Sequence, residues 1–330
     1  MEHSDILVNI QNLSKLFPVG GGIFRHSDVF VHAVSGFNLQ IKRGESVGLV
    51  GESGCGKSTT GKLLTRLLDP TEGKIEIASE QGVIDIASLR GKKLKTFRRN
   101  VQMIFQDPYE SMNPRLTIYD TVAEPLNVQG IGTITEREAR ITELLETVGL
   151  TPAASFLFRY PHELSGGQRQ RVAIARALII SPLFVVADEP TSMLDVSVRT
   201  GVMHLMQDLA TNLNVTYLYI THDLAVARYM CNRIAVMYLG KLVELAETEE
   251  LLQHAQHPYT KALLSAVPVP DPTYKRSAVE IKGGISKPIN PEPRCRFYDR
   301  CPLADDSCRD NPHPELEDKG DQHFVACHKI

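Results

Sequence analysis

Residues 51–58 of this chain read GESGCGKS, and this short stretch sets the expected architecture. The stretch matches the phosphate-binding pattern G-x-x-x-x-G-K-[ST]. It follows the apolar run at residues 46–50 and leads into GKSTTGKLLTRLL, which has helical spacing, so strand, glycine-rich loop and helix come in the order that the motif requires. The sequence therefore predicts a nucleoside-triphosphate site at this loop.

The residue types in this loop suit the binding of a triphosphate. Glycines let backbone N–H groups wrap the β-phosphate, and Lys57 supplies a cation to the β- and γ-phosphate oxygens. Ser58 offers a hydroxyl to Mg²⁺, and Thr59 begins the helix whose positive end faces the anion. The predicted nucleotide-binding residues of the loop are Gly51, Ser53, Gly54, Cys55, Gly56, Lys57, Ser58 and Thr59.

An acidic pair follows a second apolar stretch. In LFVVAD, residues 183–188, Asp188 stands at the end of a predicted strand, where its carboxylate can hold the Mg²⁺ shell. Glu189 comes next and can accept a proton from an attacking water. Together with the phosphate loop, this pair predicts Mg²⁺-dependent hydrolysis of a nucleoside triphosphate.

The pentapeptide LSGGQ, residues 164–168, narrows the class to one family. With this motif, the chain resembles the ATP-binding subunits of ABC transporters. Glycines permit close backbone approach, and the N-terminus of a helix attracts phosphate. The resemblance implies that two chains sandwich two nucleotides, and that the ATP bound on the partner subunit is contacted by Ser165, Gly166, Gly167 and Gln168.

The other motifs of the family occur in the family's order. The resemblance implies that Gln106 senses Mg²⁺ and the attacking water, and that His222 contacts the γ-phosphate. It also implies that Phe17 stacks on adenine, and that Asp195 in SMLD lies in the loop that crosses the dimer interface. The implied catalytic set is Glu189, His222 and Gln106, and the implied Mg²⁺ set is Ser58, Gln106 and Asp188.

Length and periodicity place the chain in the α/β class. At about 150 residues per domain, 330 residues predict two domains, and strands alternating with helices indicate a mostly parallel sheet covered on both faces. The resemblance implies an ABC-type P-loop ATPase core at residues 1–250, with a helical subdomain at about 107–182. A small cysteine-bearing extension is expected at residues 251–330, where six prolines in residues 268–293 predict an extended connection.

Charge and hydropathy limit the classes of partner. The 36 basic and 39 acidic residues give a net charge of −3, which indicates no general affinity for nucleic acid. No apolar run reaches the ~18–20 residues needed to cross a bilayer, and the start of the chain lacks the pattern of a signal peptide. These features predict that the chain stays in the cytosol, and the resemblance implies a peripheral protein at the cytoplasmic face of the cell (inner) membrane. The resemblance implies a second, related ATP-binding subunit in a heterodimer, two transmembrane permease subunits and an extracytoplasmic substrate-binding protein.

The C-terminal sequence bears on the transported substrate. HPYTKALLSAVPVPDP, residues 257–272, and the cysteine-bearing stretch from Arg294 resemble the extension of the oligopeptide/dipeptide transporter ATPases, in particular of their second ATP-binding subunit. This resemblance implies peptide import, and it leaves open nickel, glutathione and oligosaccharide importers with the same tail. A soluble ABC ATPase acting on nucleic acid or ribosomes is a further alternative, which the single cassette and near-neutral charge disfavour.

Four of the six cysteines fall within the last 36 residues, with the spacing C-x5-C-x6-C-x18-C. In a reducing compartment four thiolates indicate a metal before disulfides. Zinc usually uses C-x2–4-C pairs, which neither gap matches, and resemblance to transporter ATPases with such tails implies a [4Fe–4S] cluster. Zn²⁺ and free or disulfide-bonded cysteines stay open as alternatives. The predicted ligands are Cys295, Cys301, Cys308 and Cys327.

Overall fold

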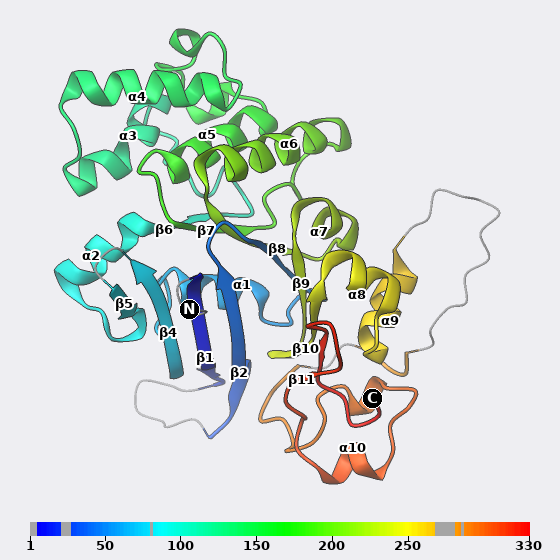
Figure 1. The fold of residues 1–330 in the computed structure, drawn as a ribbon. Coiled ribbons are helices and arrows are strands. Elements are labelled where there is room, and N and C mark those ends of the chain that lie inside the picture. The colour runs from blue at the N-terminus through cyan, green and yellow to red at the C-terminus, as the bar shows by residue number, and fades with distance from the viewer. Residues whose placement is uncertain (1–4, 21–27, 80–81, 268–280, 285–286) are drawn as a thin grey trace. The chain divides into compact units, whose positions relative to one another are not determined.

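Figure 1 shows the computed structural model, which describes residues 5–20, 28–79, 82–267, 281–284 and 287–330. The predicted extended connection falls largely outside these ranges. Two compact units make up the chain. The first contains Met1–Ile41, Ser46–Ala87 and Tyr219–Ile330, and the second contains Lys42–Glu45 and Ser88–Leu218.

A four-stranded sheet forms part of the first unit, in the order β2-β1-β4-β5, with antiparallel β1–β4 and β4–β5 pairs (Figure 1). In the β1–β4 pair Val8 lies opposite Ile77 and Ile10 opposite Ile75, and all four side chains are buried. Because a slip of one residue would turn these side chains to the other face, burial fixes the register. The strands are β1 (Ile6–Pro18), β2 (Phe30–Lys42), β4 (Glu72–Ser79) and β5 (Gly82–Asp85).

A second group of strands in the first unit carries the phosphate loop. Their order is β11-β12-β10-β9-β3, and β3, which is buried throughout, pairs in parallel with β9. β10 pairs antiparallel with both β9 and β12, so the end of the chain is attached to the strands beside the loop. The strands are β3 (Ser46–Val50), β9 (Arg233–Tyr238), β10 (Lys241–Glu247), β11 (Glu317–Asp318) and β12 (Phe324–Val325).

Helices flank these strands. α7 packs against β3, and α8 packs against β9 and β10. The helices of the first unit are α1 (Lys57–Leu64), α7 (Leu224–Met230), α8 (Thr248–His254), α9 (Pro258–Ala266) and α10 (Asp306–Asp310), with a 3-10 turn at Tyr298–Arg300. The predicted boundary near residue 250 lies inside α8. Nowhere in the described parts of the chain is a helix both long and apolar enough to cross a bilayer.

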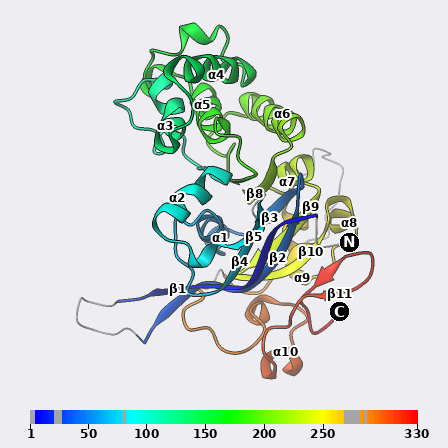
Figure 2. The same cartoon turned by 60° about the vertical axis from the view of Figure 1, so that its left-hand side comes forward.

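The second unit combines strands with a group of helices. β6 and β7 pair in parallel, with Met103 opposite Val186, and α3 packs against both α4 and α5 (Figure 2). Thr117, Thr133 and Ser165 cap the N-termini of α3, α4 and α5 with their side-chain hydroxyls. The elements are α2 (Gly91–Asn100), β6 (Val101–Ile104), α3 (Ile118–Gln129), α4 (Ile134–Thr147), 3-10 turns Ala153–Ser155 and Pro161–Glu163, α5 (Gly166–Leu178), β7 (Phe184–Asp188) and α6 (Val196–Leu213).

The strand pairing differs in part from the sequence-based expectation. Parallel pairing is observed for β3–β9 and β6–β7. The β1–β4, β9–β10 and β11–β12 pairs are antiparallel, which the prediction of a mostly parallel sheet did not include. Long-range strand pairing is set by packing between distant segments and leaves no local signal. β8 (Thr216–Thr221) contains the junction between the two units.

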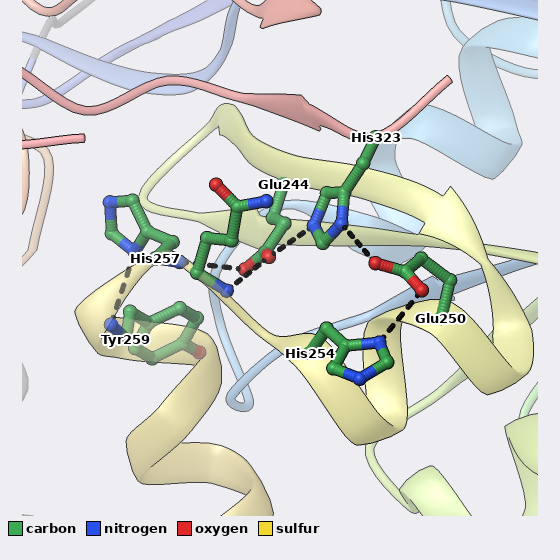
Figure 3. Close-up of polar contacts among 7 residues, drawn as sticks. Glu244, Glu250, His254, His257, Tyr259 and His323 are labelled. Atoms are coloured by element: carbon green, nitrogen blue, oxygen red, sulfur yellow. Dashed lines mark hydrogen bonds and ion pairs between the residues drawn. The ribbon is translucent and has the colours of Figure 1, made fainter. Parts of the chain in front are cut away.

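The C-terminal extension is fastened to β10 and α8 by a buried polar network (Figure 3). His323 Nε2 lies 2.7 Å from Glu244 Oε1, and its Nδ1 lies 3.2 Å from Glu250 Oε1. Glu244 also accepts hydrogen bonds from the backbone N–H groups of Gln256 and His257, at 2.7 and 3.1 Å. Glu244 and His323 are both buried, and such a carboxylate requires several donors to offset its desolvation. The network therefore fixes the end of the chain and the start of α9 together.

Acid should destabilise the fold through His257. This residue caps α9 by accepting the Tyr259 N–H at Nδ1 (3.1 Å), and burial lowers its pKa from 6.5 to about 3. Below pH 6.5 the unfolded chain therefore binds a proton that the folded chain does not, and stability falls with pH by up to about 1.4 kcal/mol per unit. His257→Asn keeps a capping acceptor and removes this titration. Urea unfolding between pH 7 and pH 4 should show a shallower loss for the variant, and identical slopes would contradict the assignment.

Candidate nucleotide site

The phosphate loop approaches two neighbouring backbones so closely that only glycine fits. A Cβ on Gly51 would lie 2.2 Å from the Met237 carbonyl oxygen, and one on Gly56 would lie 2.1 Å from the Ala33 carbonyl oxygen. Gly56 also has φ +113°, which L-residues rarely adopt, whereas Gly54 has φ +80° and open space around it. The first and last glycines of the motif are thus required by packing as well as by conformation.

The Lys57 side chain bonds to the backbone at the start of its own loop. Its Nζ donates to the carbonyl oxygens of Gly51, at 2.6 Å, and Glu52, at 3.0 Å. Lys57 is 5% exposed and is the first residue of α1, next to Ser58 and Thr59. The ammonium group and the N-terminus of α1 together provide the positive potential that a triphosphate requires, and the chain leaves open space at Gly54.

The two glycine positions give a matched test of the packing requirement. Gly54→Ala meets no neighbour and should lose about 1 kcal/mol of unfolding free energy through its left-handed conformation alone. Gly56→Ala adds a collision with the backbone of Ala33 and should lose about 3 kcal/mol or more. Equal midpoints in urea unfolding of the two variants would show that close approach does not constrain the loop.

In the second unit, Gln106 and Glu189 contact each other directly. Gln106 Nε2 donates to Glu189 Oε2 at 3.3 Å. Glu189 has φ +45°, an unusual conformation for a residue other than glycine, and its carbonyl oxygen accepts from Ser192 N and Oγ. Asp188 precedes it at the end of β7, whose five residues are all buried. The structure thus brings together three of the residues predicted for hydrolysis, with backbone strain at the position assigned to the base.

The LSGGQ residues form the N-terminus of α5, as the sequence predicts. Ser165 Oγ accepts from Gln168 N at 3.3 Å, and Gln168 Oε1 accepts from Ser165 N at 2.9 Å. This capping box satisfies the Gln168 N–H, and the N–H groups of Gly166 and Gly167 belong to the first turn, which has no intrahelical acceptor. A Cβ on Gly167 would lie 2.4 Å from Val198 Cγ1, so this glycine is held close to α6.

Three further predicted residues lie at the edges of these elements. Phe17 belongs to β1, and Lys15 Nζ lies 5.2 Å from the centre of its ring. His222 follows β8 and is exposed. Asp195 is the residue before α6, and its carbonyl oxygen accepts from the N–H groups of Val198 and Arg199. Phe17, the phosphate loop and His222 belong to the first unit, and Gln106, LSGGQ, Asp188, Glu189 and Asp195 belong to the second.

Sequence reasoning missed two residues that touch the phosphate loop. Tyr259 Oη accepts the Glu52 N–H at 2.9 Å, and Arg300 Nη1 and Nη2 donate to the Glu52 carboxylate at 2.7 and 3.0 Å. Both residues come from the C-terminal part of the chain and are more than 200 positions from Glu52. No pattern within the motif could have signalled these contacts.

The four C-terminal cysteines gather in one region. Cys295, Cys301 and Cys308 are buried in a cluster with Tyr238, and Cys295 N donates to the carbonyl oxygen of Cys308. Burial raises the pKa of Cys295 to about 11, and Cys308, Cys327 and Cys301 act in the same direction. Across the parts of the chain that the structure describes, no three His, Cys, Asp or Glu side chains are arranged to hold a metal ion.

The β3–loop–α1 geometry and the acidic pair at the end of β7 define a P-loop ATPase, and comparisons with known proteins give its family. Residues 34–192 match the family described as ABC transporter, and residues 243–308 match the oligopeptide/dipeptide transporter C-terminal region. The oligopeptide transport ATP-binding protein AppF of Bacillus subtilis is 46% identical over 99% of this chain and 98% of its own length. The chain belongs to the ATP-binding proteins of ABC transporters, as its motifs predict.

Solved structures agree with this placement. The dimeric structure of a post-hydrolysis state of the ATP-binding cassette MJ0796, bound to ADP and Pi, has a TM-score of 0.64 at 33% identity, and the match covers 73% of this chain and 99% of that one. The structure of cbiO1 from Clostridium perfringens, part of the ABC transporter complex cbiONQ, has a TM-score of 0.63 at 26% identity over 76% of this chain and 92% of its own. The α/β fold class is confirmed, and the chain is an ATPase that binds ATP with Mg²⁺.

Proposed function

We propose that this chain is the energy-coupling ATPase of an ABC importer for oligopeptides or dipeptides. The observation that carries the proposal is the match over nearly the whole length to an oligopeptide transport ATP-binding protein, together with the oligopeptide/dipeptide C-terminal region at residues 243–308. The ATPase core alone would fit many transported substrates. The C-terminal region is shared with the nickel, glutathione and oligosaccharide alternatives, so peptides are favoured by the relatives over the full length, which are named as oligopeptide or peptide transport proteins.

We assign the steps of hydrolysis to side chains of this chain. Lys57 and the loop N–H groups bind the β- and γ-phosphates, and Ser58, Gln106 and Asp188 are the residues that would hold Mg²⁺, which would neutralise phosphate charge. Glu189 accepts the proton of the attacking water. Gln106, which donates a hydrogen bond to the Glu189 carboxylate, orients that water. His222 contacts the γ-phosphate, and Phe17 stacks on adenine, with Lys15 beside the same ring.

A second chain completes the reaction pocket. The N–H groups of Gly166 and Gly167 and the hydroxyl of Ser165 stand at a helix N-terminus, where an anion is favoured. We assign them to the γ-phosphate of ATP held by the facing subunit, with Gln168 retained in the capping box and Asp195 at the dimer interface. The dimer closes on ATP and opens after hydrolysis because these contacts depend on the γ-phosphate.

This cycle requires partners in the membrane. We infer a related ATPase subunit as the other half of a heterodimer, two transmembrane permease subunits and an extracytoplasmic substrate-binding protein, with this chain at the cytoplasmic face of the inner membrane. The loop at residues 107–115, where Arg169 lies over the Tyr109 ring at 5.6 Å, belongs to the region that the family uses to contact permease helices. Tyr109 is 49% exposed and so is available for such a contact.

Replacing Glu189 tests the hydrolytic assignment. In Glu189→Gln the amide oxygen can still accept from Gln106, so ATP binding should persist while hydrolysis by the assembled transporter falls about 10²–10⁴-fold. Glu138→Gln, an exposed change on α4, is the matched control and should leave turnover unaffected. Full ATPase activity in the Glu189 variant would refute its role as the base.

We also propose that Cys295, Cys301, Cys308 and Cys327 ligate a metal centre, with a [4Fe–4S] cluster favoured over Zn²⁺. Four thiols supply the donor set that both centres use, three of them lie in one buried cluster, and the spacing lacks the short pairs of zinc sites. Because the side chains are not arranged as a ligand group in the described residues, ligation requires the thiols to rearrange. Such a centre would stabilise a segment that has little apolar core of its own.

Metal analysis distinguishes the two centres. Protein purified without oxygen should contain iron and acid-labile sulfide in about equal amounts and absorb in the visible range. Cys308→Ser should lower both contents, whereas Cys231→Ala, which removes a thiol packed beside Gly48, should leave them unchanged. Stoichiometric zinc without sulfide would contradict the cluster and support the zinc alternative, and protein without metal would refute both.

A further inference from the structure

Glu52, the second residue of the phosphate loop, is held at three points. Its carboxylate accepts two hydrogen bonds from Arg300, its N–H donates to Tyr259 Oη, and its carbonyl oxygen accepts from Lys57 Nζ. The first two contacts come from the C-terminal part of the chain, and the third comes from the lysine assigned to the triphosphate. Glu52 is therefore a junction between the C-terminal region and the nucleotide-binding residues.

The ion pair at this junction is largely removed from water. The Arg300 side chain is 8% exposed and that of Glu52 is 23% exposed. Two parallel N–H···O bonds give the pair a defined orientation. Removal of one partner would leave the other charge partly buried and unpaired, which is costly.

Aromatic packing determines where Arg300 lies. It ends the 3-10 turn Tyr298–Arg300, directly before Cys301, and its guanidinium lies 5.7 Å from the centre of the Tyr238 ring. Phe297, three residues earlier, contacts the rings of Tyr238 and Tyr259 at centroid distances of 5.1 and 5.5 Å. The same cluster thus positions both C-terminal groups that reach Glu52.

We propose that Arg300 is a positioning residue for ATP binding, which neutralises Glu52 and fixes the first turn of the phosphate loop. A carboxylate in this loop stands beside a ligand that carries several negative charges, and an unpaired one would repel it. Arg300 cancels that charge, and Tyr259 fixes the peptide N–H of the same residue. The C-terminal region is in this way part of the nucleotide site.

A reciprocal effect follows from this arrangement. If the ordered C-terminal segment favours ATP binding, ATP must stabilise that segment by the same factor. MgATP should therefore slow amide hydrogen exchange in residues 295–301, next to the cysteines. The proposal rests on the proposed function in one respect, which is that the phosphate loop is the ATP site.

Binding of MgATP to the full chain tests the proposal. Arg300→Ala should weaken binding about tenfold, and Arg300→Ala with Glu52→Gln should recover most of that loss, because the repelling charge is gone. Arg300→Lys keeps the cation without the paired bonds and should lose about threefold. Arg228→Ala breaks the comparable bidentate pair with Glu249, which is exposed and lies outside the loop, and should bind as the wild type does.

The outcomes separate this inference from the proposed function. Wild-type affinity in Arg300→Ala, or no recovery in the double variant, would overturn the positioning role alone, whereas a wild-type chain that does not bind MgATP would overturn the ATP site itself. If Arg300→Ala does not fold, Arg300→Lys and its combination with Glu52→Gln decide the question by the same comparison. In the assembled transporter the KM for ATP should rise while kcat at saturating ATP is retained, and a fall in kcat alone would contradict the inference.

Discussion

The close approach of the phosphate loop to the backbones of Ala33 and Met237 is the constraint on which the site depends. A Cβ at position 51 or 56 would lie only 2.1–2.2 Å from a backbone carbonyl oxygen, so both residues must be glycine. The loop has no room to move away from these backbones. Lys57 then bonds to carbonyl oxygens at the other end of the loop, and α1 begins at once. The fold therefore preorganises the triphosphate site, because the backbone N–H groups of the loop are already held in place before a triphosphate binds.

The C-terminal extension illustrates how a small segment can be held without a large core. Near its end, His323 bonds to Glu244 of β10 and Glu250 of α8. Closer to its start, Arg300 forms an ion pair with Glu52 of the phosphate loop. Three of the four cysteines, Cys295, Cys301 and Cys308, lie in the same buried cluster as Tyr238, Tyr259 and Phe297. A metal centre there would therefore act on a segment that also contacts the nucleotide loop.

Local patterns predicted much of this molecule. The phosphate loop was expected between β3 and α1, the apolar run ending in Asp188 forms β7, and LSGGQ leads into α5. These features depend on neighbours within a few residues. The β2-β1-β4-β5 sheet could not be predicted, because its pairs depend on packing between distant strands. The Glu52–Arg300 pair spans 248 positions, so nothing near either residue indicates it.

The central claim is that ATP is hydrolysed between two chains, each of which supplies half of the pocket. Cryo-electron microscopy of the assembled transporter, trapped with ATP by Glu189→Gln, tests this most directly. We predict that the γ-phosphate on the loop of this chain will meet the LSGGQ helix of the facing subunit, and that Ser165 of this chain will meet the nucleotide of its partner. A nucleotide enclosed by this chain alone, with its own LSGGQ or none, would contradict the mechanism.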